Sequence, residues 1–250
     1  MIPWLEHDAP FPPVESALRH PNGLLAAGGD LSARRLLTAY RNGIFPWYSG
    51  SEPLLWWSPD PRMVLYTVDF RVSRSLAKSV RNRGYVTRMD TAFAQVLAGC
   101  AGPRDFGRDM ACTDAGARTW LSMDMQAAYQ KLHQLGYAHS VETWQGDVLV
   151  GGLYGVAIGR MFFGESMFSR GRDASKVALA ALIGELLRRQ FPMIDCQMNT
   201  PHLASFGARE IGRREFLRSV GALVHYDEPP GSWQMAAKGE ATLDEAPCHD

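Results

Sequence analysis

The pattern of apolar and polar residues differs between two parts of the chain, and the change comes near Met63. Before it, prolines, glycines and tryptophans interrupt the apolar runs. Proline fixes its own φ and disfavours a helical residue before it, so short elements joined by rigid turns are expected. Only residues 32–42 have helical periodicity, with Ser32 as N-cap and three apolar residues on one side: Leu36, Leu37 and Tyr40. We interpret this part as a small domain or a clasp on a larger one.

Helical patterns are longer after Met63. Helical periodicity covers residues 124–135, where Gly136 ends it, and residues 174–189, where Asp173 is expected to cap the first turn. A shorter helix is predicted for residues 213–220. The apolar faces of the two longer helices are expected in the core, and they comprise Met125, Ala128, Tyr129, Leu132, Leu179, Leu182, Ile183 and Leu186.

Strands are predicted between and after these helices. Strand character is found at residues 140–144, 148–156, 160–165 and 193–196. Turns at residues 145–147 and 157–159 make the first three an antiparallel meander. A helix, a meander, a helix and a strand in this order are typical of an α+β, acetyltransferase-like (GNAT-type) domain. We expect three parts and one surface loop: a small N-terminal domain (1–62), the acetyltransferase-like domain (63–233), a disordered tail (234–250) and a loop at 102–118.

A short basic helix is predicted to end near Gly84. Its apolar residues recur at every fourth position: Val72, Leu76 and Val80. Between Arg71 and Arg88 there are six basic residues and no acidic residue. On the outer face of the helix lie Arg74, Lys78 and Arg81. This basic stripe is either a solvated helix face or a contact to an RNA backbone, and the segment by itself leaves both interpretations open.

Composition narrows the protein class. With 46% hydrophobic and 21% charged residues, the chain is typical of a globular protein with a substantial core. No apolar stretch approaches the ~18 residues that span a bilayer, and the N-terminus lacks the features of a signal peptide. The four cysteines form no Cys-x-x-Cys pair, which argues against zinc and disulfides. We therefore expect a cytoplasmic protein with no metal and no membrane partner. The net charge of zero does not indicate a nucleic-acid partner.

Two short segments combine polar groups with apolar surroundings. Glu165 lies among aromatic residues and methionine, where it is either a buried carboxylate or an edge residue facing water. Asp195 and Gln197 end an apolar strand, and alternation places both on one side and Cys196 on the other. They either form a site or satisfy nearby backbone groups. A nucleophilic pair of Cys196 with His202 is disfavoured, because the cysteine shares its strand face with a core residue.

Several blocks of the sequence resemble leucyl/phenylalanyl-tRNA–protein transferases. They run in order over nearly the whole chain: PNGLLA at residues 21–26, GGDLS at 28–32, NGIFPW at 42–47, WWSPDPR at 56–62, GESMFS at 164–169, ASK at 174–176 and IDCQ at 194–197. The resemblance implies a small N-terminal domain and an acetyltransferase-like C-terminal domain. It also implies transfer of Leu or Phe from an aminoacyl-tRNA to the N-terminal amine of a protein that starts with Arg or Lys, which marks that protein for N-end rule degradation.

The resemblance further implies site residues and partners. No cofactor is needed, because the ester is already activated, and a monomer is expected. As catalytic residues it implies Asp195, Gln197 and Glu165. We hypothesise that Gln197, polarised by Asp195, orients the amine and helps relay its proton; Asp195 either acts through water or holds the basic side chain of the acceptor. Glu165 would contact the aminoacyl end of the tRNA. The amino-acid side chain of the charged tRNA would lie in a pocket of Leu153, Phe162, Met167 and Leu182. Its terminal adenosine would be held by Trp47 and Trp120. Its acceptor stem would be contacted by Arg74, Lys78 and Arg81.

Two alternatives and one departure from the family pattern accompany this interpretation. The first alternative is a coenzyme A-dependent N-acyltransferase on the same fold, disfavoured because residues 169–174 lack the expected pyrophosphate-binding pattern Gln/Arg-x-x-Gly-x-Gly/Ala. The second is a non-catalytic reader of basic N-termini. The family asparagine after the Asp-Cys-Gln block is displaced here to Asn199, so its role is open, as is the preference among Leu, Phe and Met.

Overall fold

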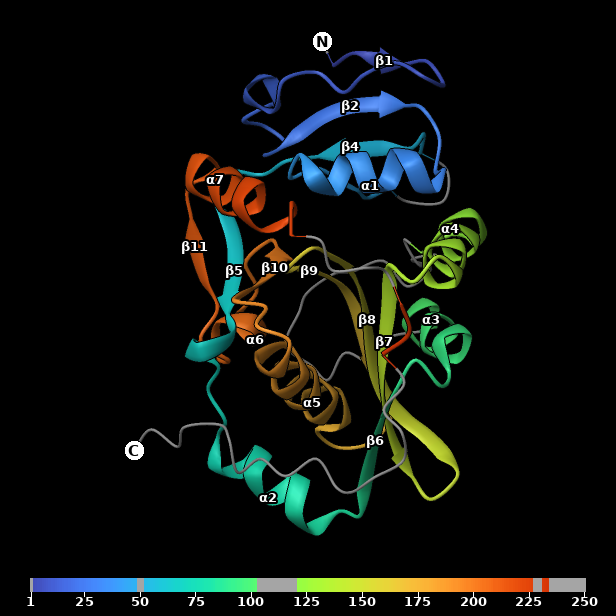
Figure 1. The fold of residues 1–250 in the computed structure, drawn as a ribbon, viewed down its shortest axis with the longest axis vertical. Helices are drawn as coiled ribbons and strands as arrows, with labels where there is room; N and C mark the ends of the chain where they lie inside the picture. Colours follow the sequence, from blue (N-terminus) through green and yellow to red (C-terminus); the bar gives the residue numbers. More distant parts are fainter. Residues whose placement is uncertain (1, 49–51, 103–120, 227–230, 234–250) are drawn as a thin grey trace.

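The computed structural model describes residues 2–48, 52–102, 121–226 and 231–233. Its N-terminal part contains a four-stranded sheet in the order β1 (Trp4–Leu5), β2 (Leu24–Gly28), β4 (Leu55–Trp57) and β3 (Phe45–Pro46). Helix α1 (Ala33–Arg41) lies beside this sheet, at the top of Figure 1. The helix begins as predicted, because the Ser32 Oγ accepts the backbone N–H of Arg35 at 3.2 Å.

The second sheet has seven strands and carries the rest of the fold. Its strand order is β11 (Arg209–Ile211), β5 (Arg62–Tyr66), β10 (Met193–Gln197), β9 (Met161–Ser169), β8 (Val148–Ile158), β7 (Ala138–Gln145) and β6 (Tyr85–Met89). All neighbours are antiparallel except β9 and β10, which are parallel. Parallel neighbours need a crossover connection, and helix α5 (Ala174–Arg188) provides it.

Helices cover both faces of the large sheet. On one face lie α5 and α2 (Arg74–Asn82) (Figure 1). They enclose an apolar cluster that includes Phe162 and Leu182. On the other face α3 (Phe93–Ala101), α4 (Met123–Gln134) and the N-terminal part enclose a second cluster, which includes Tyr40 and Phe163. Adjacent residues of β9 thus belong to different faces. The remaining helices are η1 (Val14–Ser16), η2 (Thr67–Asp69), α6 (Pro201–Ala204) and α7 (Arg213–Leu223).

The α+β class, the longer helices and the antiparallel meander are confirmed, with shifted ends. Strand β9 continues to Ser169, and the turn before it begins at Gly159, whose φ of +57° suits glycine. Asp173 does not cap α5 with its side chain: its φ is +60°, and its carboxylate accepts the Ser79 Oγ at 2.7 Å instead. The elements β5, β6, β11 and α3 were not predicted.

Two other predictions concern segments that the structure does not describe. The surface loop predicted at 102–118 falls, apart from Gly102, outside the described residues, as does the predicted tail 234–250. Among the helices that are described, none is long and apolar enough to cross a membrane. The same part of the chain contains no group of three His, Cys, Asp or Glu residues arranged to hold a metal ion.

Candidate functional site

Glu165 is turned out of the regular strand pattern by a bulge. In the β8–β9 ladder Tyr154 pairs with Ser166 and Gly155 pairs with Gly164, so Glu165 has no residue opposite it. Such an extra residue locally redirects side chains. The parallel ladder between β9 and β10 has its last pair at Phe163 and Asp195, just before Glu165. Glu165 therefore lies where these two strands stop pairing.

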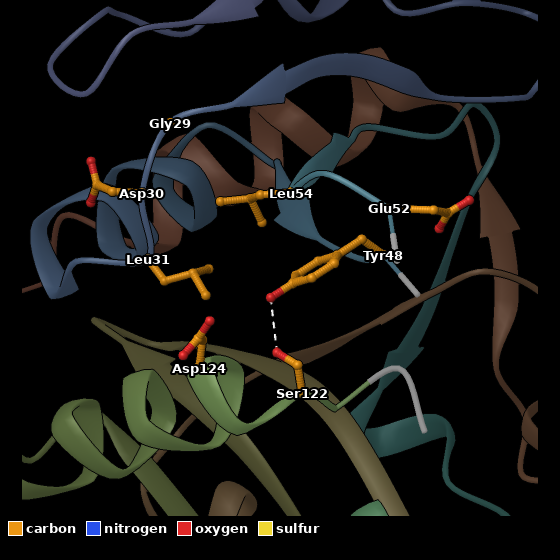
Figure 2. A pocket seen from close by; sticks show the side chains of 8 residues that line it. All are labelled: Gly29, Asp30, Leu31, Tyr48, Glu52, Leu54, Ser122 and Asp124. Carbon is orange, nitrogen blue, oxygen red and sulfur yellow. Dashed lines mark hydrogen bonds between the residues drawn. The ribbon is translucent and has the colours of Figure 1, made fainter. Parts of the chain in front are cut away.

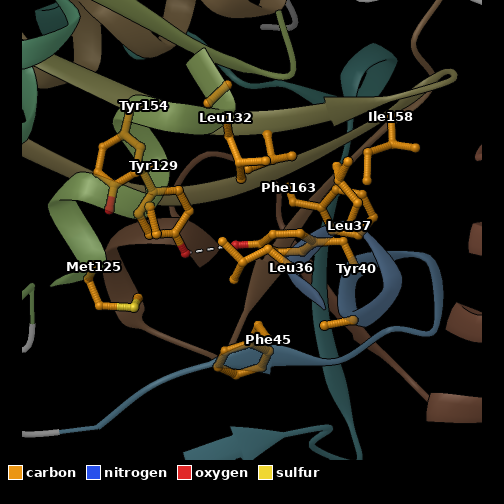
Figure 3. Close-up of a cluster of buried hydrophobic side chains, with 14 of the residues drawn as sticks. Leu36, Leu37, Tyr40, Phe45, Met125, Tyr129, Leu132, Tyr154, Ile158 and Phe163 are labelled. Atoms are coloured by element: carbon orange, nitrogen blue, oxygen red, sulfur yellow. Dashed lines mark hydrogen bonds between the residues drawn. The ribbon is translucent and has the colours of Figure 1, made fainter. Parts of the chain in front are cut away.

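Three side chains from different elements converge on the Glu165 carboxylate. The hydroxyl of Tyr40 in α1 donates to Oε1 at 2.8 Å, and the amide of Gln197 in β10 donates to the same oxygen at 3.1 Å. The hydroxyl of Tyr129 in α4 donates to Oε2 at 2.6 Å. The two tyrosine hydroxyls are also 2.7 Å apart, and Figure 3 shows them meeting within an apolar cluster. Both tyrosines were predicted only as members of apolar helix faces, so their role at Glu165 is not visible in the sequence.

The protonation state of this cluster is finely balanced. Burial raises the pKa of Glu165 to about 7, although the Tyr129 and Tyr40 donors oppose the rise. Burial and then the Glu165 charge raise the pKa of Tyr129 well above its usual value, so its hydroxyl stays protonated. The carboxylate and the two hydroxyls make three short O···O contacts. Two phenol hydrogens cannot fill three contacts, whereas a protonated carboxyl supplies the third. Glu165 can therefore take up and release a proton near neutral pH.

Asp195 is engaged by a buried arginine that the sequence analysis did not single out. Arg62 Nε donates to Asp195 Oδ1 at 2.8 Å and Arg62 Nη2 donates to Oδ2 at 2.7 Å, with both side chains only 1% exposed. The Cζ atom of Arg62 lies 4.7 Å from the ring centroid of Phe45 and 4.6 Å from that of Phe216. This two-point pairing with a planar guanidinium is the strong form of an ion pair.

This pairing bears on the predicted roles of Asp195. The carboxylate is buried and its charge is balanced by Arg62, which argues against a role in holding the basic side chain of an acceptor. Its Oδ1 instead accepts the backbone N–H of Gln197 at 2.9 Å, where Gln197 has a left-handed φ of +63°. Asp195 therefore fixes the backbone that aims the Gln197 amide at Glu165.

Cys196 lies on the other side of β10, as alternation predicted. It packs against the α5-side cluster, as Ile194 does. Burial raises the pKa of its thiol, which makes it a poor nucleophile and agrees with the weak case for a pair with His202.

The residues predicted to form an amino-acid pocket are brought together on the α5 face of the sheet. Leu153, Phe162 and Leu182 are each at most 3% exposed, and Met167 packs on the same cluster. Phe162 precedes Phe163, whose ring lies 5.0 Å from that of Tyr40 on the opposite face. The apolar cluster and the tyrosine pair thus flank β9 from its two faces, with Glu165 at the place where β9 and β10 separate.

The other predicted contact residues lie in separate places. Trp47 is 39% exposed, with its ring 5.5 Å from that of Trp57, and Trp120 is outside the described residues. Arg74, Lys78 and Arg81 are exposed on α2, and no ion pair within the described residues engages them. Asn199 is exposed after β10, and nothing in the structure explains its displacement.

A cavity of about 560 Å³ lies between the N-terminal part and the start of α4 (Figure 2). Beside it the Tyr48 hydroxyl and the Ser122 Oγ are 2.9 Å apart. Three carboxylates also line it: Asp30, Glu52 and Asp124. None of the predicted site residues lines it. Tyr48 directly follows Trp47 in the chain, so the cavity begins next to one predicted contact residue.

Comparisons with known proteins add to this geometry. A family model described as "Leucyl/phenylalanyl-tRNA protein transferase" matches residues 64–221, and one described as its N-terminal domain matches residues 29–60. Among solved structures, that of L-PGS from Bacillus licheniformis aligns with 80% of this chain and 65% of its own, with a TM-score of 0.38 and 12% identity. That likeness is too distant to carry a conclusion.

Relatives in several bacteria are far closer. The leucyl/phenylalanyl-tRNA–protein transferase of Chromobacterium violaceum is 55% identical over 97% of this chain and 100% of its own length. That of Azoarcus sp. is 55% identical over 96% of this chain and 98% of its own. That of Thiobacillus denitrificans is 58% identical over 89% of this chain and 94% of its own. The chain belongs to the leucyl/phenylalanyl-tRNA–protein transferase family.

Proposed function

We propose that this chain transfers leucine or phenylalanine from an aminoacyl-tRNA to the N-terminal amine of a protein. The observation that carries the chemistry is the Glu165 carboxyl, whose pKa of about 7 lets it accept a proton at neutral pH. A general base is most effective when its pKa lies near the working pH, and it typically contributes about 10²–10⁴-fold to the rate. Family membership supports the substrates.

In the proposed reaction the neutral amine attacks the ester carbonyl carbon and Glu165 takes up the amine proton. Oε1 of Glu165 accepts from Tyr40 and Gln197. Oε2 of the ionised carboxylate accepts from Tyr129 and has capacity to accept an N–H of the amine as well, which places that hydrogen for transfer to Glu165. The amide nitrogen of Gln197 points to Glu165, so its amide oxygen can accept a second N–H of the amine. The new amide bond replaces the ester bond, and the proton ends on the released ribose hydroxyl.

The substrate contacts are proposals of the same kind. Leu153, Phe162, Met167 and Leu182 would enclose the Leu or Phe side chain, whose burial contributes about 1.5–3 kcal/mol. Trp47 and Trp120 would hold the terminal adenosine, and the basic stripe of α2 would contact the acceptor stem. We further propose Arg or Lys as the first residue of the acceptor, a monomer, and a cytoplasmic location where charged tRNA is found.

The proposed acetyltransferase-like architecture rests on the parallel β9–β10 pair and its α5 crossover. We propose the division into domains 1–62 and 63–233 because the small sheet lies wholly before Arg62, where β5 begins. Coenzyme A is disfavoured because residues 169–174, at the start of α5, lack the expected pyrophosphate-binding pattern.

A transfer assay tests the function against its two alternatives. The full chain is incubated with an Arg-starting peptide and either labelled leucyl-tRNA or labelled acetyl-coenzyme A. We expect the peptide to gain one leucine from the tRNA and nothing from acetyl-coenzyme A. Acetylation would favour the acyltransferase, and stoichiometric peptide binding without extension would favour the reader.

A further inference from the structure

A chain of hydrogen bonds connects Arg62, through Asp195, to Gln197, one of the donors to Glu165. The guanidinium holds both oxygens of Asp195, and Asp195 Oδ1 holds the backbone N–H of Gln197. Gln197 has a left-handed φ, a conformation that a side-chain-bearing residue keeps only when its surroundings impose it. From that backbone the Gln197 amide donates to Glu165 Oε1. One end of the guanidinium therefore determines where the Gln197 donor lies.

The other end of the same guanidinium reaches the second donor through α1. Arg62 Nη1 donates to the carbonyl of Gly43 at 3.2 Å. Gly43 follows the C-cap residue of α1, and its N–H donates to the carbonyl of Tyr40 at 3.0 Å. Tyr40 then donates to Glu165 Oε1. Two chains of hydrogen bonds that start on one guanidinium thus end on one carboxylate oxygen.

We propose, on the basis of the proposed function, that Arg62 is a positioning residue that fixes the Tyr40 and Gln197 donors on Glu165. Arginine suits this task because its planar fork sends donors in two fixed directions, whereas lysine offers a compact charge on a flexible stem. The rings of Phe45 and Phe216 pack on the guanidinium, with their centroids 4.7 and 4.6 Å from its Cζ atom. Arg62 is buried, and its hydrogen bonds go to Asp195 and Gly43, so it acts on Glu165 through other residues.

A purely structural role for the ion pair leads to a different expectation. Replacing a buried pair by apolar residues is often neutral for stability. If Arg62 and Asp195 only support the fold, a folded Arg62→Met/Asp195→Leu double variant should keep its turnover. If Arg62 positions the donors, that variant should fold and still turn over slowly.

The test combines a conservative variant with a matched control. Arg62→Lys keeps the charge and removes the fork. Arg35→Lys is the control, because Arg35 is also a buried arginine, with its Cζ 5.0 Å from the Phe11 ring, and it bonds the carbonyls of Glu6 and His7. With leucyl-tRNA and an Arg-starting peptide, we expect Arg62→Lys to lower kcat by about 10- to 100-fold at unchanged KM for the tRNA. The control should keep its kcat.

A second measurement does not depend on activity. The titration midpoint of the Glu165 carboxyl is followed by ¹³C NMR, with the signal assigned by its absence in Glu165→Gln. We expect a higher midpoint in Arg62→Lys than in the wild type, because lost donors disfavour the ionised form, and no change in Arg35→Lys. A folded Arg62→Lys protein or double variant with wild-type kcat and midpoint would overturn the proposal. Failure of the wild type to use leucyl-tRNA would instead overturn the proposed function, and the NMR comparison would still decide the role of Arg62.

Discussion

At the scale of single residues, the balance of hydrogens around Glu165 decides what this site can do. A carboxyl held by Tyr40, Tyr129 and Gln197 could have been a fixed structural charge. Its burial instead raises its pKa to about 7, so both protonation states are accessible. Residues whose pKa is shifted in this way are concentrated at functional sites. The stability of the fold and the chemistry of the site therefore depend on the same ionisation.

The donors on Glu165 can be removed one at a time. Tyr129→Phe should raise the pKa of Glu165 above about 7, because the ionised form loses a hydrogen bond. The acidic limb of the kcat profile should then move to higher pH, with a lower rate at pH 7 that recovers at higher pH. Tyr85→Phe is the control, since the Tyr85 hydroxyl donates to the carbonyl of Arg172 instead. Equal profiles for both variants would contradict a role of Tyr129 at Glu165.

Glu165 should also cost the protein stability above its pKa. Its folded pKa of about 7 exceeds the ordinary 4.5, so the buried ionised form is disfavoured and the free energy of unfolding falls as pH rises from 4.5 to 7. Glu165→Gln should therefore be more stable than the wild type at pH 8, by about 1–3 kcal/mol, with a smaller difference at pH 5. Urea unfolding at both pH values measures this. A variant that loses stability at pH 8 would show that the buried carboxylate is not a net cost.

At the scale of elements, hydrophobic periodicity predicted the helices that have one apolar face. Helices α1, α4 and α5 have a serine cap, a glycine stop or an apolar stripe, so their positions followed from local patterns. Helix α3 has almost no polar face and β5 is a short apolar run, so each fits helix and strand equally well. Strands β6 and β11 are short and contain charged residues, so no apolar run marks them. The bulge at Glu165 was unpredictable for a related reason, because it depends on how β8 pairs with β9.

The basic stripe of α2 has a prediction of its own. Replacing Arg74, Lys78 and Arg81 with Ala should raise KM for leucyl-tRNA and flatten its salt dependence by about one unit of log–log slope per lost phosphate contact, while kcat stays unchanged. Arg214→Ala/Arg218→Ala on α7, where both arginines are also exposed, is the matched control. The stripe would be an ordinary solvated face if the triple variant and the control had the same salt slope.

At the scale of the whole molecule, the candidate site is built from residues that are far apart in the sequence, so no local pattern predicts it. Arg62 and Asp195 are 133 positions apart, and the residues around each of them give no sign that the two side chains form an ion pair. Tyr40 and Glu165 are 125 positions apart, so a buried tyrosine looks like a core residue until its hydroxyl partner is known. The family blocks contained Glu165, Asp195 and Gln197 but not the geometry that gives Asp195 a supporting role.

Trp233, in the described segment 231–233, packs into the apolar cluster on the α5 face of the large sheet. The Trp233 ring stacks on His139 with centroids 4.0 Å apart, and its backbone N–H donates to Asp90 Oδ2 at 2.7 Å. Trp233→Ala should lower the free energy of unfolding by about 3–5 kcal/mol, because it empties a filled core position. Urea unfolding measures the loss, and an unchanged midpoint would mean that this segment does not anchor the fold.

The most direct test of the central claim is the pH dependence of leucyl transfer in the wild type and in Glu165→Gln. Single-turnover rates are measured from pH 5.5 to 8.5 with an Arg-starting peptide. Titration of the peptide amine is common to both proteins, so it cancels in the ratio of their rates. We predict that the ratio of the wild-type rate to the Glu165→Gln rate rises with pH, with a midpoint at pH about 7, and reaches about 10²–10⁴. A ratio that stays near one at every pH would contradict Glu165 as the group that receives the amine proton.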